Sequence, residues 1–183
     1  MKQLIKEALA GNNESFVSMM ELNMQSMYKT AWVYLKNDED VADAVQDTIL
    51  TCYEKLYTLR NPKYFKTWMT RILINKCNDM LRKRRRYELD EALPERGAEE
   101  EHYADCEWKA VLSRLPEKYQ QVLSLYYIEG LSAKEISQVL EINLNTVLTR
   151  LSRAKKKLRA EYFFDEAGCT LEPTFSVAGE GRL

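Results

Sequence analysis

Strand-forming patterns and proline are scarce in this sequence. No segment sustains the alternation of apolar and polar residues that a half-buried strand requires, and proline occurs only at positions 62, 94, 116 and 173. Apolar residues instead recur at helical spacing along most of the chain. The sequence therefore predicts an all-α protein.

The residues that build catalytic and metal centres are also scarce. His102 is the single histidine, the four cysteines contain no C-x-x-C pair, and there is no glycine-rich phosphate loop. We therefore expect no catalytic residues, no metal site and no cofactor, and the protein is not expected to be an enzyme. Cys52 and Cys77 fall on apolar helix faces and are predicted to be reduced core residues.

Long apolar runs are missing as well. The longest fall far short of the roughly 18 residues that a membrane span needs. The N-terminal residues MKQLIKEALAGNNE lack the apolar region of a secretory signal. The sequence therefore predicts a cytoplasmic protein without membrane insertion.

Charge is unevenly distributed along the chain. The net charge of −1 alone argues against a nucleic-acid partner. However, residues 60–86 contain ten Lys and Arg and one acid, and residues 150–159 contain six bases and no acid. Between them, residues 87–107 contain nine acids and one Arg. The two basic blocks are candidate phosphate-binding surfaces, and the acidic segment is predicted to be a flexible linker.

Apolar periodicity and helix-breaking residues divide the chain into two small helical units. Asn61-Pro62 breaks the first unit and predicts a loop over 59–68. Because the linker is expected to be flexible, the units should move independently until a partner fixes them. The predicted helices are 13–36, 39–58, 67–85, 106–114, 117–128 and a closing pair within 131–159.

The segment LSAKEISQVLEINLNTVLTRLSRAKKKLR, residues 131–159, predicts a helix-turn-helix. Ser132 and Glu135 match a capping box, and Asn143 is a candidate N-cap for the second helix. One face of that helix carries an apolar stripe, and the opposite face carries hydroxyl, amide and guanidinium groups. This combination suits a DNA major groove. A solvated amphipathic helix is the alternative. The stripe is Val147, Leu151, Ala154 and Leu158, and the opposite face is Asn145, Thr149, Ser152, Arg153 and Lys156.

The order of these segments resembles an extracytoplasmic-function sigma factor, group IV of the bacterial sigma-70 family. The resemblance rests on KNDEDVADAVQDTILTCYEKL and FKTWMTRILINKCNDMLRKRRR in the first unit, and on LSRLPEKYQQVLSLYYIEGLSAKEISQVLEINLNTVLTRLSRAKKKLR in the second. It implies a sigma region 2 helical bundle and a sigma region 4 helix-turn-helix joined by the acidic linker. The boundaries are 1–86 for region 2, 87–106 for the linker, 107–160 for region 4 and 161–183 for a C-terminal tail expected to be mobile.

The family function implied is alternative transcription initiation. Such a factor binds core RNA polymerase and directs it to promoters by reading the −35 element as duplex and the −10 element as single strand. Members are commonly held inactive by an anti-sigma protein, and the sequence leaves open whether this chain has one. The rival hypothesis is a free-standing helix-turn-helix regulator that acts without polymerase. Residues 39–86 discriminate against it, because a repressor needs no acidic polymerase-facing helix followed by an aromatic and basic loop.

The resemblance places two sets of contacts in the first unit. For some of these residues an ordinary structural role is an alternative: Glu54 on a solvated face, and Trp68 in the core. Aromatic walls and hydrogen-bonding groups are what a flipped base needs, and lysines and arginines provide phosphate contacts. The polymerase-binding set is Asp43, Gln46, Asp47 and Glu54. The −10 set is Lys63, Tyr64, Phe65, Lys66, Trp68, Arg71, Asn75, Lys76, Arg82, Lys83 and Arg84.

In the second unit the resemblance places the −35 contacts on the last helix. Two positions depart from the family pattern. Leu148 stands where a base is common, so one contact is either missing or replaced by an apolar contact to a thymine methyl. Glu141 stands at the turn where glycine is common. A left-handed conformation there would cost about 1 kcal/mol, so the turn is expected to be less regular than usual. The −35 set is Asn145, Thr146, Thr149, Arg150, Ser152, Arg153 and Lys156.

Overall fold

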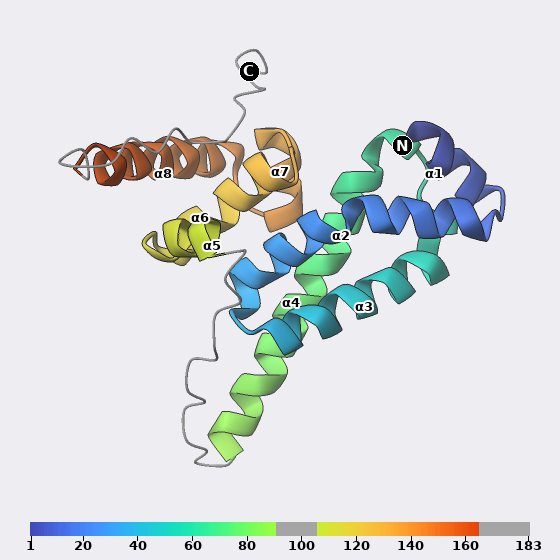
Figure 1. The fold of residues 1–183 in the computed structure, drawn as a ribbon, viewed down its shortest axis with the longest axis horizontal. Coiled ribbons are helices and arrows are strands. Elements are labelled where there is room, and N and C mark those ends of the chain that lie inside the picture. The colour runs from blue at the N-terminus through green and yellow to red at the C-terminus, as the bar shows by residue number, and fades with distance from the viewer. Residues whose placement is uncertain (91–105, 165–183) are drawn as a thin grey trace.

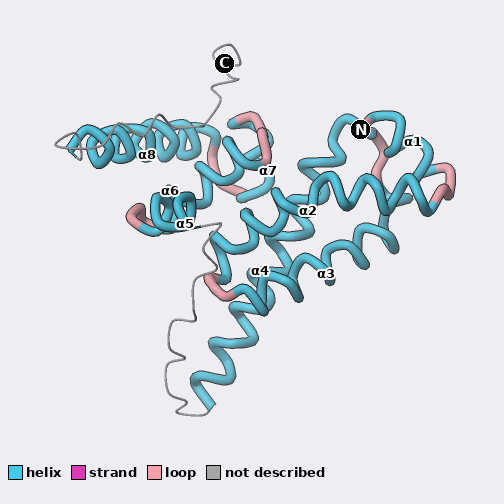
Figure 2. Tube along the Cα trace, viewed as in Figure 1, coloured by secondary structure: helices cyan, strands magenta, loops and turns pink. Residues whose placement is uncertain are grey.

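The structure is a computed structural model that describes residues 1–90 and 106–164, with side chains placed through residue 86 and over 108–159. Within these ranges only helices and short loops occur (Figure 2), which confirms the all-α prediction. The α-helices are α1 Lys2–Leu9, α2 Asn13–Leu35, α3 Asp38–Lys55, α4 Phe65–Asp90, α5 Cys106–Ser113, α6 Glu117–Leu123, α7 Ala133–Leu140 and α8 Leu144–Phe164. Two 3₁₀ turns, η1 Leu56–Thr58 and η2 Pro62–Tyr64, and a π-helical turn, η3 Ser124–Ile128, complete the set.

Helices α1 to α4 form the first domain, in which α2, α3 and α4 pack together and the C-terminal half of α4 projects beyond the others (Figure 1). Asparagine side chains start two of these helices. Asn12 accepts a hydrogen bond from the Ser15 N–H, and Asn37 accepts one from the Asp40 N–H. The core beneath them is built from fully buried side chains: Met19, Met27, Ala31, Val41, Met69 and Leu73. Helix α1 was not predicted, because its eight residues are fixed by packing of Ile5 and Ala8 into this core.

Helices α5 to α8 form the second domain. Ser132 and Glu135 form the predicted capping box of α7. Asn143 accepts the Asn145 N–H at the start of α8, as expected of an N-cap. Glu141, at the end of α7, has a φ of 54°, so the turn does take the left-handed conformation. The helix-turn-helix prediction is confirmed, whereas the less regular turn expected at Glu141 is not: this residue takes the left-handed conformation without being glycine.

The two domains are packed against each other, contrary to the expectation that they would be independent. Val33 of α2 and Ile74 of α4 are buried in the same core cluster as the second domain's helices. Trp32 and Trp108 meet edge to face, with ring centroids 5.2 Å apart. The expectation rested on the flexible linker alone, whereas α2 and α4 carry apolar residues on two sides, one in each core.

Two predicted boundaries also differ. The loop expected over 59–68 is shorter, because Asn61 caps η2 by accepting the Lys63 N–H and α4 begins at Phe65. The predicted linker begins inside α4, which continues to Asp90. The remaining linker residues, 91–105, and the tail beyond 164 lie outside the described residues.

Candidate nucleic-acid and polymerase interfaces

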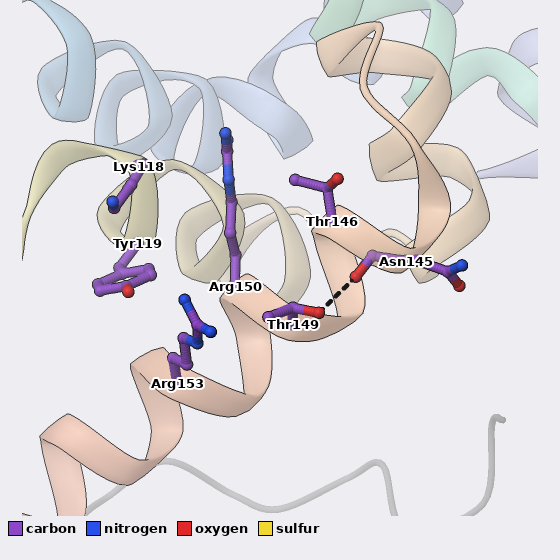
Figure 3. A pocket seen from close by; sticks show the side chains of 7 residues that line it. All are labelled: Lys118, Tyr119, Asn145, Thr146, Thr149, Arg150 and Arg153. Atoms are coloured by element: carbon purple, nitrogen blue, oxygen red, sulfur yellow. Dashed lines mark hydrogen bonds between the residues drawn. The ribbon is translucent and has the colours of Figure 1, made fainter.

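The outward face of α8 borders an open concavity of about 320 Å³ between α8 and α6 (Figure 3). The apolar back of the helix is buried, with Val147 and Ala154 fully inaccessible. Because the back is fixed in the core, the polar face must point outward. Five of the predicted −35 residues line the concavity: Asn145, Thr146, Thr149, Arg150 and Arg153. Ser152 and Lys156 are exposed on the same helix.

Lys118 and Tyr119 of α6 line the same concavity and were missed by the sequence analysis. Tyr119 is mostly buried, and the Lys118 ammonium lies 5.4 Å from its ring centroid. A lysine here can add positive charge beside Arg150 and Arg153. Nothing local in the sequence marks it, since the approach of α6 to α8 is set by tertiary packing.

Leu148 is exposed on α8, 44 % accessible, among the predicted DNA-reading residues. Thr149 is held in place by donating a hydrogen bond from its hydroxyl to the Asn145 carbonyl, 2.7 Å away (Figure 3). An exposed leucine on this face is available for apolar contact. Its placement suits an apolar contact to a thymine methyl.

The predicted −10 residues separate into exposed and buried positions on η2 and α4. Tyr64 and Asn75 are exposed and offer an aromatic ring and an amide. Phe65 is only 2 % exposed and belongs to the first core, so its assignment to a base-contacting wall was wrong. Trp68 is partly buried against the same core, with its ring 6.1 Å from that of Phe65. Phe65 therefore packs against Trp68 from the core side.

The predicted phosphate-binding cations of α4 differ in their surroundings. Lys76 pairs with Asp47 of α3 at 3.6 Å, which links a predicted −10 residue to a predicted polymerase residue. Arg82 pairs with Asp79 at 3.1 Å on the exposed part of the helix. Such exposed pairs are weak and screened by salt, so a phosphate can replace either carboxylate. Lys63, Lys83 and Arg84 are exposed.

The exposed face of α3 carries the predicted polymerase residues. Asp43, Gln46, Asp47 and Glu54 all point away from the core, as the helical pattern predicted. Leu50 and Tyr53 lie between them and are 56 % and 54 % exposed. The face is therefore mixed, acidic and apolar. The helical spacing of Leu50 and Tyr53 with the acids could have identified them.

A buried carboxylate lies where the two domains meet. Glu129, at the end of η3, is 1 % exposed and accepts hydrogen bonds from the hydroxyls of Thr30, at 2.9 Å, and Ser26, at 3.3 Å. The Lys66 ammonium lies 3.6 Å from the Glu129 carboxylate and forms an ion pair with it. Burial raises the pKa of Glu129, although Lys66 and the two hydroxyls oppose that rise.

Comparison with known proteins identifies the chain. The family model for sigma-70 region 2 matches residues 19–87, and that for sigma-70 region 4 matches residues 107–158. The sigma factor SigV of Bacillus subtilis is 36 % identical over 141 residues, which cover 75 % of this chain and 84 % of SigV. The ECF sigma factor SigW of the same organism is 27 % identical over 180 residues, covering 88 % of this chain and 96 % of SigW. The chain belongs to the extracytoplasmic-function group of the sigma-70 family.

The solved structure of the sigma factor CnrH, in complex with the cytosolic domain of CnrY, resembles this sigma factor along most of its length. The two chains are 27 % identical with a TM-score of 0.64, and the match covers 90 % of this chain and 97 % of CnrH. The sigma factor is thus an alternative initiation factor that directs RNA polymerase to promoters. A free-standing regulator is not favoured.

Among the residues that the structure describes, none of the helices of this sigma factor is long and apolar enough to span a bilayer. Within the same residues, no group of three or more histidine, cysteine or acidic side chains could hold a metal ion.

The raised pKa of Glu129 predicts how the stability of this sigma factor depends on pH. Folding favours the protonated carboxyl, so this contribution to stability is complete below the unfolded pKa and is lost as pH rises through the folded pKa. Two groups with shifted pKa values titrate outside the window between about pH 5 and pH 7. Burial lowers the pKa of Lys36 to about 8, and the pKa of Glu135 is lowered from its ordinary value. Stability should therefore fall across that window.

Urea unfolding of the wild type and the Glu129→Gln variant at about pH 5, 6 and 7 tests this expectation. Glutamine is nearly isosteric with the neutral acid and keeps an oxygen acceptor, so the variant should lack the Glu129 part of the slope. Titrating groups that do not interact with Glu129 cancel in the comparison. Parallel pH profiles for the two proteins would contradict the assignment.

Proposed function

We propose that the two domains of this sigma factor divide promoter recognition between them. In this proposal residues 1–86 bind core RNA polymerase and capture the opened −10 strand, and residues 107–160 read the −35 duplex. The observation that carries it is the outward face of α8, where hydroxyl, amide and guanidinium groups surround an open concavity while the apolar back is buried.

The −35 element would be read by α8 lying in the major groove. Thr149, Arg150 and Arg153 are the proposed base-reading residues, since an arginine can form two hydrogen bonds with a guanine edge. Lys156 of α8 and Lys118 of α6 supply charge for the flanking phosphates. The concavity between α6 and α8 gives these cations room to approach the DNA backbone.

The −10 element would be captured as a single strand along η2 and α4. Tyr64 offers an exposed ring on which a base can stack, and Asn75 offers an amide that can read a base edge. Lys63, Lys76 and the basic end of α4 follow the strand's phosphates. The chain supplies positioning only: in this proposal the bond-forming chemistry belongs to the polymerase, with which the factor acts in the cytoplasm.

Core RNA polymerase is the proposed partner of α3, through Asp43, Gln46, Asp47 and Glu54. An inhibitory protein partner, an anti-sigma factor, is a further proposal. It is supported by the family resemblance, and CnrH is bound to a protein domain, the cytosolic domain of CnrY, in its solved structure. Pull-down of core polymerase by the full chain, followed by sequencing of run-off transcripts, tests the function. Specific duplex binding without any affinity for core polymerase would contradict it.

Replacing both Gln46 and Asp47 with alanine should weaken binding to core polymerase, by about tenfold or more if the pair lies at the centre of the contact. Both side chains are exposed, and Asp47 makes only the surface pair with Lys76, so the fold should survive. The Glu21→Ala/Gln25→Ala variant is the matched control, since it removes an exposed acid and an exposed amide from α2. Fluorescence titration of core polymerase with each variant is the measurement, and equal affinities would remove α3 from the interface.

A further inference from the structure

Two leucines, Leu144 and Leu148, are exposed on α8 beside the residues to which we assign −35 reading. Leu144 is 40 % exposed and Leu148 is 44 % exposed. Among residues 108–159, where side chains are described, the only other large apolar side chain with comparable exposure is Tyr127. Single exposed leucines are ordinary, whereas two together on a face that is otherwise polar and basic need an explanation. The polar contacts proposed for this helix leave the leucine pair without a role.

Helical spacing makes the two leucines neighbours. They are four residues apart, so their side chains lie on one side of α8, about 6 Å apart along its axis. Val147 and Leu151, on either side of Leu148 along the stripe that faces inward, are buried in the core of the second domain. The core is therefore filled by other residues of the same helix, and the leucine pair stays on the surface.

The leucine pair lies next to polar residues of the −35 set. Asn145 follows Leu144, Thr149 follows Leu148, and both polar residues line the concavity between α8 and α6 (Figure 3). The exposed surface of α8 thus has two adjacent strips, a polar one with Asn145, Thr149 and Arg153 and an apolar one with the leucine pair. A helix that lies in the major groove with the polar strip on base edges brings the apolar strip to base edges as well.

One base offers an apolar group to such a strip. In the major groove thymine presents its C5 methyl group, whereas the other three bases present hydrogen-bond donors and acceptors without a methyl. A leucine forms no hydrogen bond, so against a different base it would remove water from a polar group and leave that group unpaired. The leucine pair therefore favours thymine through contact with the methyl group and disfavours the alternatives.

We propose that Leu144 and Leu148 are specificity-determining residues of this sigma factor, which select thymines at two positions of the −35 element through their methyl groups. The inference rests on the proposed −35 role of α8. Base pairs stack about 3.4 Å apart and the leucines are about 6 Å apart along the helix axis, so the two methyl groups belong to different base pairs. Burying one methyl group changes affinity roughly fourfold, which is the preference that each leucine gives.

The test removes the methyl group from the DNA as well as the leucine from the protein. The full chain first enriches its binding site from a pool of randomised duplexes, and each thymine of that site is then replaced by deoxyuridine, which keeps the hydrogen-bonding groups and lacks the methyl. We expect a roughly fourfold loss of wild-type affinity at two positions. Leu148→Ala should lose the effect at one position and Leu144→Ala at the other. Leu22→Ala removes an exposed leucine from α2 and should behave as the wild type.

Two additional comparisons isolate the methyl group from other effects. At each position found with uracil, duplexes that carry cytosine or 5-methylcytosine differ only in the methyl, so methylation should raise wild-type affinity roughly fourfold and leave the matching alanine variant unchanged. Leu148→Arg is the reciprocal variant. It should lose the methyl preference at its position, bind all duplexes more tightly and steepen the salt slope by about 1.

The possible failures can be told apart. Uracil losses of equal size in the wild type and in both alanine variants would overturn the proposal, as would an enriched site without thymine. A wild-type protein that enriches no duplex would overturn the −35 role of α8 itself. Weaker binding of Leu148→Ala to core polymerase, with an unchanged response to uracil, would mean that the leucine pair contacts protein and not DNA.

Discussion

Replacing Arg150 or Arg153 with alanine should relax base preference at one position of the −35 element. An arginine that forms two hydrogen bonds with guanine contributes about 1–3 kcal/mol of discrimination, equivalent to roughly 5- to 150-fold between the correct and the wrong base. Both side chains line the open concavity beside Thr149, on the side of α8 opposite its buried apolar stripe. The expected change is therefore in specificity rather than stability.

Binding titrations against single-base-substituted −35 duplexes, at two salt concentrations, make this measurement. Lys156→Ala is the control on the same helix, since an exposed lysine that contacts phosphate should weaken binding to all sequences alike. It should also reduce the salt slope by about 1. A uniform loss across all sequences for both arginine variants would mean that they position α8 and do not read bases.

Replacing Asn75 with alanine should impair opening of the promoter more than initial binding to it. The side chain is exposed on α4, so its loss should leave the fold intact. A hydrogen-bonding amide lost from a base-reading site costs about 1–3 kcal/mol, which corresponds to roughly 5- to 150-fold in the stability of the open complex. Duplex binding through α8 should be unaffected, because α8 lies in the other domain.

Permanganate footprinting of open complexes, together with duplex binding assays, separates these two steps. Gln25→Ala removes an exposed amide from α2, away from the proposed strand path, and should change neither measurement. Loss of −35 duplex binding with normal opening in the Asn75→Ala variant would reverse the roles assigned to the two domains.

Local sequence patterns predicted this fold correctly where a single short segment determines the local structure. The capping box of Ser132 and Glu135 and the N-cap at Asn143 are each encoded within a few residues. The outward faces of α3 and α8 followed from helical periodicity, because a buried stripe fixes which side chains point to solvent.

The sequence predictions were wrong or incomplete where tertiary packing determines which side chains are buried and which residues meet. Phe65 and Tyr64 look equivalent in the sequence, yet the start of α4 turns one ring into the core and leaves the other exposed. Glu129 and Lys66 are far apart in the chain, and no periodic pattern predicts that they meet. Lys118 likewise joins the −35 face only through the packing of α6 against α8.

The burial of two thiols has a consequence for how this protein responds to oxidants. Cys52 on α3 and Cys77 on α4 are fully buried and unpaired, and burial raises the pKa of each to about 12. The thiolate is the form that oxidants and alkylating reagents attack, so both sulfurs are protected chemically as well as sterically. Oxidants should therefore leave α3 and α4, the helices proposed to contact polymerase and the −10 strand, unmodified while the first domain is folded. Modification of either thiol would report unfolding of that domain.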